Sequence, residues 1–205
     1  QVFERLTEEP RLLALLDLRA DAVQSRALSL GAQHLGLACD VTDGSSVRTA
    51  VATAAARLGT IDALVNNAGI AEQNAPTLEQ TAEGFDRVLA VNLRGTFLVT
   101  QAVLAVMQKQ PRDPRGNRGA IVNLASIASL AGIPGRNAYS AAKAGVVGMT
   151  RALASEWARE GIRVNLEPIK CEYTRTQCRI VDTGHAVQVG VGAGLGLRVM
   201  GKRFE

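Results

Sequence analysis

Three residues in the sequence have the types and spacing needed to move a proton to or from a carbonyl or alcohol oxygen. Ser126 is followed by Tyr139 thirteen residues later, and Lys143 comes four residues after the tyrosine. Tyr139 and Lys143 would project from one helical face, because residues at i and i+4 are neighbours there. An ammonium near a phenol favours the phenolate and lowers the phenol pKa from about 10, which prepares the group for acid–base work. Ser126 can hold the substrate oxygen within hydrogen-bonding reach of the phenol.

The alternative interpretation of these three residues is purely structural. A helix can carry an amphipathic tyrosine and a solvated lysine that have nothing to do with a serine in a loop. The spacing argues against this alternative, because the chain contains only 2 tyrosines and a chance match of both partners to one of them is rare.

Strands and helices that alternate along the chain would position these residues. Apolar runs of strand length stand at Arg11–Leu18, His34–Val41, Ile61–Val65, Ala120–Ser126 and Ile162–Leu166. Helical patterns cover Ala20–Leu30, a segment capped by Ser45 or Ser46 that ends at Leu58, Thr81–Gln110 and Ala138–Glu160, which closes at Gly161. Nearly continuous apolar strands separated by helices predict an α/β fold with a doubly wound parallel sheet covered on both faces. A single domain over residues 1–205 is expected.

Polar side chains fall where the predicted strands end. These positions are Asp17, Asp40, Asn66–Gly69 and Ser126. Ligands of doubly wound sheets bind beyond the carboxyl ends of the strands. The pattern therefore predicts a binding site at this edge of the sheet.

The composition excludes several other classes of protein. Hydrophobic residues make up 47% of the chain and the net charge is +4, which argues against disorder. The three cysteines and the histidines His34 and His185 lack the spacing of metal ligands, so no metal site is expected and both histidines are interpreted as surface or satisfied residues. Aromatic residues are scarce and the arginines do not share a helical face, so no nucleic-acid partner is expected. A polar start and no run of 18 apolar residues predict a cytoplasmic protein without a membrane span.

Several motifs resemble those of the classical short-chain dehydrogenases/reductases and occur in the same order along the chain. The Asn66–Gly69 turn (NNAG) is similar to the family's turn of that sequence, and Asn92 is similar to its catalytic asparagine. Ser126, the segment Tyr139–Lys143 (YSAAK) and Arg163–Asn165 (RVN) resemble its active-site serine, its YxxxK box and the strand that follows. The resemblance spans about Leu12–Asn165. It implies a Rossmann-like three-layer fold, NAD(P)-dependent hydride transfer, a small alcohol or ketone substrate, and a homodimer or homotetramer.

The resemblance also implies a role for each catalytic candidate. Tyr139 would be the general acid or base, and Lys143 would bind the nicotinamide ribose and tune Tyr139. Ser126 would fix the substrate oxygen, and Asn92 would hold a water that relays protons from Lys143. An alternative for Asn92 is a helix-kink asparagine beside Gly95.

Cofactor contacts are expected at the ends of the first three predicted strands. A carboxylate at Asp17 can accept both ribose hydroxyls of NAD and would repel the 2′-phosphate of NADP, so NAD is the expected cofactor; the alternative is a helix N-cap. Asp40, with Val41 beside it, resembles the family residue that meets the adenine amine, and an N-cap role is equally open. The turn that would pack its backbone against the cofactor, or else form a turn without a ligand, consists of Asn67, Ala68 and Gly69.

The sequence departs from the family at both ends. The family's first strand and its TGxxxGxG turn would precede Leu12, and Gln1–Glu9 is interpreted as the end of the helix that follows that turn. After Leu166 the family's Pro-Gly pair is replaced by Glu167-Pro168, although Tyr173–Thr176 resembles the segment that normally follows. Residues 166–205 are therefore described as a divergent tail.

Two segments of this tail have competing interpretations. Thr183–Val189 resembles the family's last strand. Gly190–Gly196 followed by a helix-like basic run over Arg198–Phe204 is either a displaced phosphate loop or, as favoured here, a flexible terminus. These departures leave a rival function open, in which the chain is a catalytically impaired family member that acts as a binding or oligomerisation partner.

Overall fold

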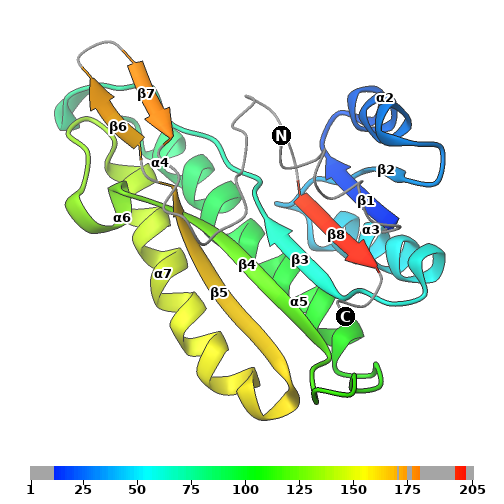
Figure 1. Cartoon of the computed structure of the whole chain (residues 1–205). Helices are drawn as coiled ribbons and strands as arrows, with labels where there is room; N and C mark the ends of the chain where they lie inside the picture. Colours follow the sequence, from blue (N-terminus) through cyan, green and yellow to red (C-terminus); the bar gives the residue numbers. More distant parts are fainter. Residues whose placement is uncertain (1–11, 170, 175–176, 181–196, 202–205) are drawn as a thin grey trace.

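A six-stranded sheet forms the middle layer of the molecule (Figure 1). The computed structural model describes residues 12–169, 171–174, 177–180 and 197–201. The strands of the sheet, in spatial order, are β2 (Leu35–Ala38), β1 (Leu12–Asp17), β8 (Leu197–Gly201), β3 (Ala63–Asn66), β4 (Gly119–Ser126) and β5 (Ile162–Ile169). The helices are α2 (Ala20–Leu30), α3 (Gly44–Leu58), α4 (Ala82–Leu89), α5 (Thr96–Met107), α6 (Ala128–Ala131) and α7 (Asn137–Trp157). A separate antiparallel ribbon joins β6 (Cys171–Thr174) to β7 (Gln177–Ile180).

The pairing of the strands confirms the predicted doubly wound α/β fold. β1 pairs with β2, β3 with β4, and β4 with β5, all in parallel. Each of these pairs is joined through a segment that contains a helix, as parallel connections require. The five predicted strands are therefore present, with bounds shifted by a few residues.

The exception is β8, which lies between β1 and β3 and runs antiparallel to both. The helix expected over Arg198–Phe204 is wrong for its described part, because Leu197–Gly201 is a strand. Its backbone groups pair with two strands far away in sequence, and such non-local pairing overrides a weak local helical preference. The other interpreted tail segments and the N-terminal one, at residues 1–11, 175–176 and 181–196, lie outside the described residues.

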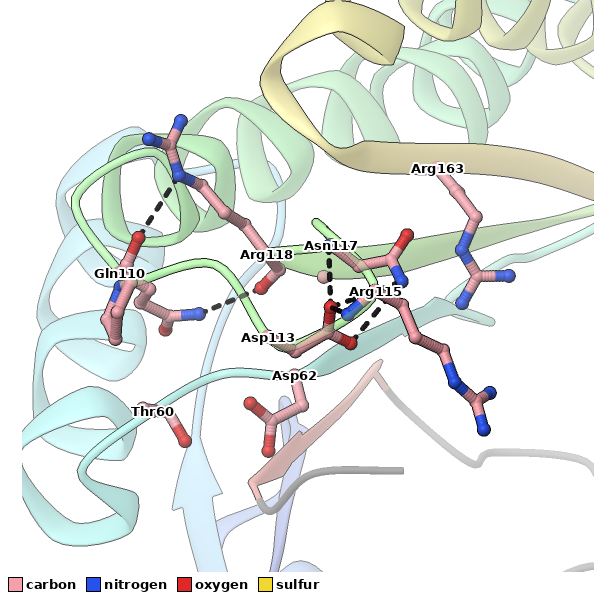
Figure 2. Close-up of a pocket in the computed structure, with 10 residues that line it drawn as sticks. Thr60, Asp62, Gln110, Asp113, Arg115, Asn117, Arg118 and Arg163 are labelled. Carbon is pink, nitrogen blue, oxygen red and sulfur yellow. Dashed lines mark hydrogen bonds between the residues drawn. The ribbon is translucent and has the colours of Figure 1, made fainter. Parts of the chain in front are cut away.

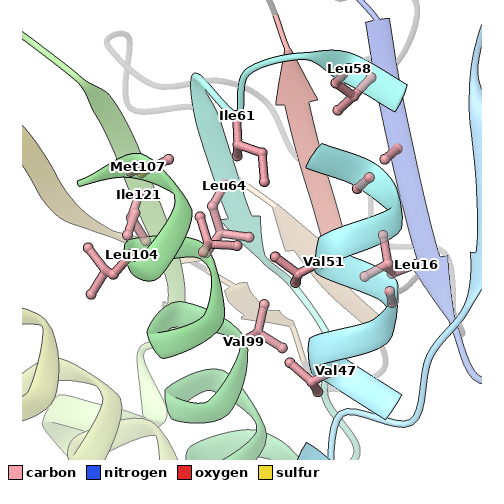
Figure 3. Close-up of a cluster of buried hydrophobic side chains, with 14 of the residues drawn as sticks. Leu16, Val47, Val51, Leu58, Ile61, Leu64, Val99, Leu104, Met107 and Ile121 are labelled. Atoms are coloured by element: carbon pink, nitrogen blue, oxygen red, sulfur yellow. The ribbon is translucent and has the colours of Figure 1, made fainter. Parts of the chain in front are cut away.

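Helices cover both faces of the sheet. Alternation along β1 sends Leu13 and Leu15 toward α2 and sends Ala14 and Leu16 toward α3. The larger core lies on the second side, where α3 and α5 pack their apolar stripes on the strands (Figure 3). Its fully or nearly fully buried side chains include Val51, Leu64, Val99, Val103, Met107 and Ile121. Each such side chain stabilises the fold by roughly 1.5–3 kcal/mol.

The helix ends confirm one of the predicted boundaries and correct one predicted N-cap. α2 has the predicted bounds and ends at Gly31, whose amide bonds the carbonyls of Ala27 and Leu28. The cap expected at Ser45 or Ser46 is wrong. Asp43 is the N-cap of α3, and its carboxylate accepts from the amides of both serines. A carboxylate with two oxygens can take two first-turn amides, and its charge also suits the helix N-terminus.

The long helix between β3 and β4 is interrupted by a π-helical turn at Ala90–Gly95. A Cβ on Gly95 would lie only 2.8 Å from Cγ2 of Val41, so glycine is needed for this close approach. The whole run, Ala82–Met107, is long and apolar enough to cross a membrane by length and composition alone. Its α5 half, however, buries Val99, Val103 and Met107 against the sheet, as a core helix does.

Candidate active site

The predicted site residues gather at one edge of the sheet. β1, β3 and β4 run in the same direction, so their carboxyl ends at Asp17, Asn66 and Ser126 meet there. β4 extends three residues beyond the Asn66–Asn123 pairing, which carries Ser126 past the end of β3. The sequence expectation of a polar edge is thus confirmed for these three strand ends.

Lys143 connects the helix α7 to this edge. Its side chain is buried, with 7% exposure, and its Nζ donates to the carbonyl oxygen of Leu124 on β4 at 2.6 Å. The same Nζ lies 5.7 Å from the centre of the Tyr139 ring, within the range of a cation–π contact. Burial lowers the pKa of Lys143 to about 8. The i, i+4 pairing predicted from sequence is therefore present.

Ser126 is the last residue of β4, two residues beyond the carbonyl that Lys143 contacts. It is nearly buried, and its Oγ accepts from the amide of Ala128 at 3.2 Å, at the start of α6. This contact uses a lone pair and leaves the hydroxyl hydrogen to be donated elsewhere. Ser126 is thus fixed at the sheet edge with a donor still available.

Asn92 lies in the π-helical turn and is completely buried. Its side-chain amide binds both backbone groups of Ile70: Oδ1 accepts from the Ile70 amide at 2.8 Å, and Nδ2 donates to the Ile70 carbonyl at 2.7 Å. Ile70 directly follows Gly69, so Asn92 fixes the end of the Asn67–Gly69 turn. The bend suggested as its alternative role is present as the π-helical turn, and the water relay stays a prediction.

Asp17 is not the N-cap of α2. That position is held by Arg19, whose side chain makes no cap bond. Asp17 instead accepts from the Arg19 amide at 3.0 Å, and its Oδ1 lies 3.7 Å from Arg19 Nε. The alternative N-cap role is therefore wrong, because the chain needs two further residues to enter the helix. The carboxylate stays at the end of β1, where the ribose contact was predicted.

Asp40 is not an N-cap either, since Asp43 holds that position on α3. Its Oδ1 accepts from the amide and the hydroxyl of Thr42, at 2.8 and 2.7 Å. These contacts shape the turn after β2 and bring Val41 against Gly95. The contact of Asp40 and Val41 with an adenine stays a prediction.

The side chains at this edge suit the two outer parts of a nicotinamide cofactor. A carboxylate at Asp17 is an acceptor for ribose hydroxyls, and the buried Lys143 Nζ has N–H groups beyond the one given to Leu124. No glycine-rich turn that could cradle a pyrophosphate occurs within the described residues. The described residues therefore fit the ribose ends of such a cofactor.

Sequence reasoning missed a buried polar network beneath the site. Asn66 Nδ2 donates to Thr100 Oγ1 and to Asn123 Oδ1, each at 2.8 Å, and Asn123 Nδ2 donates to Thr150 Oγ1 at 2.9 Å. The network ties β3, β4, α5 and α7 together. An asparagine or threonine inside an otherwise apolar strand or helix was the available signal, since buried polar groups require partners.

Glu72 was not predicted to belong to the site; its Oε1 accepts from the Tyr139 amide at 3.1 Å. Nothing in the local sequence around Glu72 signals this contact, because the two residues are 67 positions apart.

A polar pocket lies at the opposite edge of the sheet (Figure 2). It is lined by residues at the amino ends of the strands and in the loop before β4, including Asp62, Asp113, Arg115 and Arg163. Its volume of about 80 Å³ is far below the roughly 300–1,000 Å³ of ligand pockets. Asp113 mainly organises the loop, by accepting from the amides of Arg115 and Asn117. This pocket is therefore separate from the candidate active site.

Known proteins of similar sequence and fold include dehydrogenases and reductases. A family model described as enoyl-(acyl carrier protein) reductase matches residues 2–179. D-Threitol dehydrogenase of Mycolicibacterium smegmatis is 44% identical over 156 residues, which cover 75% of this chain and 57% of that protein. The crystal structure of levodione reductase has a TM-score of 0.73 at 36% identity, over 80% of this chain and 63% of the other. That of 3-ketoacyl-(acyl-carrier-protein) reductase from Brucella melitensis, complexed with NADH, has a TM-score of 0.71 at 32% identity, over 78% and 65%.

The match covers most of this chain but a smaller share of each of these proteins. The chain spans about 57 to 65% of the length of these three proteins. Within that span the structure of levodione reductase and that of the Brucella melitensis reductase share the α/β fold of this chain. With a family model matching residues 2–179, the conclusion is that this chain belongs to the short-chain dehydrogenase/reductase family.

Proposed function

We propose that the chain is an NAD(P)-dependent oxidoreductase that interconverts a small alcohol and the corresponding ketone. The observation that carries the proposal is the position of Lys143. Its buried Nζ reaches β4 two residues before Ser126 and also reaches the ring of Tyr139. A serine hydroxyl, a phenol and an ammonium near the carboxyl end of β4 support the proposal, because doubly wound sheets bind ligands at that edge. The names of the relatives, a threitol dehydrogenase and a levodione reductase, support a small polar alcohol or ketone.

The residues of the chain would handle the proton and hold the reacting oxygen. When bound, a nicotinamide cofactor supplies or accepts the hydride. Ser126 donates its hydroxyl hydrogen to the substrate oxygen and orients it toward the phenol of Tyr139. Tyr139 gives a proton to that oxygen in the reductive direction and removes one from the alcohol in the oxidative direction.

Lys143 would support both steps. Its ammonium lies beside the ring of Tyr139, and an N–H not engaged with Leu124 is available to a ribose hydroxyl. Because burial lowers the pKa of Lys143 to about 8, the ammonium is the main form below that pH and is lost above it. Asn92 would hold the relay water, while its side chain keeps the Asn67–Gly69 turn in place.

The preferred cofactor would be NAD rather than NADP. The Asp17 carboxylate stands at the end of β1, where it can accept two ribose hydroxyls and repel a 2′-phosphate. Arg19 is mostly exposed beside it and partly offsets that repulsion. A preference of about tenfold to a hundredfold is expected, equal to about 1.4–2.7 kcal/mol. If the wild type binds NADP(H) as tightly as NAD(H), or Asp17→Ala leaves the ratio unchanged, this preference is wrong.

The chain would act as a cytoplasmic homodimer or homotetramer. An apolar groove on α4, the π-helical turn, α5 and α7 is lined mainly by Leu89, Leu93, Phe97 and Met149. Phe85 and Phe97 are 37% and 44% exposed. Large side chains of this kind are commonly covered in symmetric helix pairing.

Cofactor binding and turnover together test the proposed function. A ligand that binds only the folded state stabilises it by RT ln(1 + [L]/Kd), or about 2.7 kcal/mol at a hundred times Kd. We expect millimolar NAD+ to raise the Tm, and a panel of small polyols and diketones to give turnover measured by NADH absorbance. A Tm shift without any turnover would favour the impaired binding protein. No shift with NAD+ or NADP+ would refute the enzyme.

A further inference from the structure

The start of the helix that carries Tyr139 and Lys143 is held by a residue from another element. Glu72 lies in the segment between β3 and α4, and its Oε1 accepts from the backbone amide of Tyr139 at 3.1 Å. In the reverse direction, Arg136 donates from Nη1 to the Glu72 carbonyl at 3.2 Å. The contact is therefore reciprocal.

α7 has no local side-chain cap at this end. Its N-cap residue, Arg136, makes no side-chain cap bond, and the first amide satisfied within the helix is that of Ser140, which bonds the Arg136 carbonyl. The three preceding amides need acceptors from elsewhere. Glu72 supplies one to the third of them, and its negative charge also suits the positive end of the helix dipole.

Further contacts fasten the same segment to α7. The Ala75 amide donates to the Gly135 carbonyl at 3.3 Å, and Asn137 Nδ2 donates to Thr77 Oγ1 at 3.0 Å. With Glu72, these contacts align residues 72–77 along the start of the helix. A shift of this segment would therefore move the first turn of α7.

The segment also begins at the candidate active site. Ile70, two residues before Glu72, is held at both backbone groups by Asn92. Gly69 precedes Ile70 and ends the turn expected to face the cofactor. Three parts of the site, namely that turn, Asn92 and the first turn of α7, are thus joined through a few consecutive residues.

We infer that Glu72 is a positioning residue for the proposed reaction. It acts through the Tyr139 backbone, by fixing the first turn of α7 so that the phenol is held relative to Ser126 and Lys143. Its second oxygen, Oε2, is buried without a partner among the described residues. The carboxylate is thus retained in a costly environment, as expected for a group kept for its contact with α7. The inference rests on the function proposed above.

Three variants test this inference. Glu72→Ala removes the acceptor, while Glu72→Gln keeps an oxygen that can accept from the Tyr139 amide and removes the charge. Glu79→Ala is the matched control, because Glu79 is an exposed glutamate of the same segment, in the short 3-10 turn Thr77–Glu79. Each variant carries one substitution, at position 72 or at the control position 79, and is made in the full chain.

The first readout does not depend on activity. The chain contains 2 tyrosines, so 15N-tyrosine labelling in a Tyr173→Phe background reports the Tyr139 amide alone. Its hydrogen exchange should be about fivefold faster in Glu72→Ala, the ratio that corresponds to a cap of about 1 kcal/mol. Glu72→Gln and Glu79→Ala should stay within about twofold of the parent.

The second readout is a split between kcat and KM. In Glu72→Ala, kcat should fall about tenfold or more, because small misplacements of reacting groups are costly, whereas the cofactor KM should change little. Glu72→Gln should restore most of kcat. Unchanged Tyr139 exchange in Glu72→Ala overturns the inference, and so does faster exchange with an unchanged kcat. A parent chain that binds no cofactor and turns nothing over refutes the proposed function instead, and the exchange experiment still decides whether Glu72 caps α7.

Discussion

Replacing Asn92 by alanine should destabilise the fold as well as disturb the site. The side chain is fully buried and makes two hydrogen bonds to the Ile70 backbone, at 2.8 and 2.7 Å. Alanine leaves a backbone donor and a backbone acceptor without partners, at about 1 kcal/mol or more each. The expected loss is about 2–3 kcal/mol, which lowers the Tm by about 4–12 °C for a chain of this size.

The same substitution should weaken cofactor binding, because the turn before Ile70 loses its anchor. Urea unfolding gives the stability change, and titration with NADH gives the binding change. Asn165→Ala is the matched control, since Asn165 is an exposed asparagine on β5. Asn92→Asp adds a second test: its Oδ1 can still accept from the Ile70 amide, but its other oxygen would face the Ile70 carbonyl. If Asn92→Ala unfolds within about 0.5 kcal/mol of the parent, the two bonds do not hold the turn as argued.

Three further predictions follow from the described residues. Tyr139→Phe removes the proposed proton donor and should lower turnover about 100-fold to 10,000-fold in an NADH absorbance assay, with near-normal turnover counting against its role. Burial lowers the pKa of His34, whose Nδ1 accepts from the Leu13 amide at 3.2 Å; its neutral form therefore stabilises the fold above about pH 6.5, and stability should fall as the pH drops below that value. His34→Asn should flatten this dependence in urea titrations between pH 5.5 and 7, and an unchanged slope would exclude His34. Light scattering at micromolar concentration should give at least a dimer, and the 21.6 kDa mass of the single chain would contradict the apolar interface.

Residues whose partners are local could be predicted from the sequence. The bounds of α2 followed from an apolar pattern that ends at a glycine, and the Tyr139–Lys143 pairing followed from helical spacing. The edge of the sheet that carries Asp17 and Ser126 followed from the parallel topology. In each case one periodicity or one topological rule was sufficient.

Residues whose partners are distant could not be predicted. β8 gains its structure from pairing with β1 and β3, more than 130 positions earlier in the chain, and a five-residue apolar and basic run does not reveal such pairing. Glu72 meets Tyr139 across 67 positions. Asp43 was missed for another reason: two serines with good capping propensity follow it, and the carboxylate before them accepts from both of their amides.

Unused hydrogen-bonding capacity separates the groups that can touch a substrate from those that hold the site. Asn92 uses its side-chain oxygen and one N–H in hydrogen bonds to Ile70, so its main role is to hold the backbone of Ile70 in place. Ser126 has committed only a lone pair to Ala128, so its hydroxyl hydrogen remains available. Lys143 has given one of three N–H groups to Leu124. We therefore expect catalysis to be lost most steeply on changing Ser126, Lys143 or Tyr139, and stability to be lost most steeply on changing Asn92.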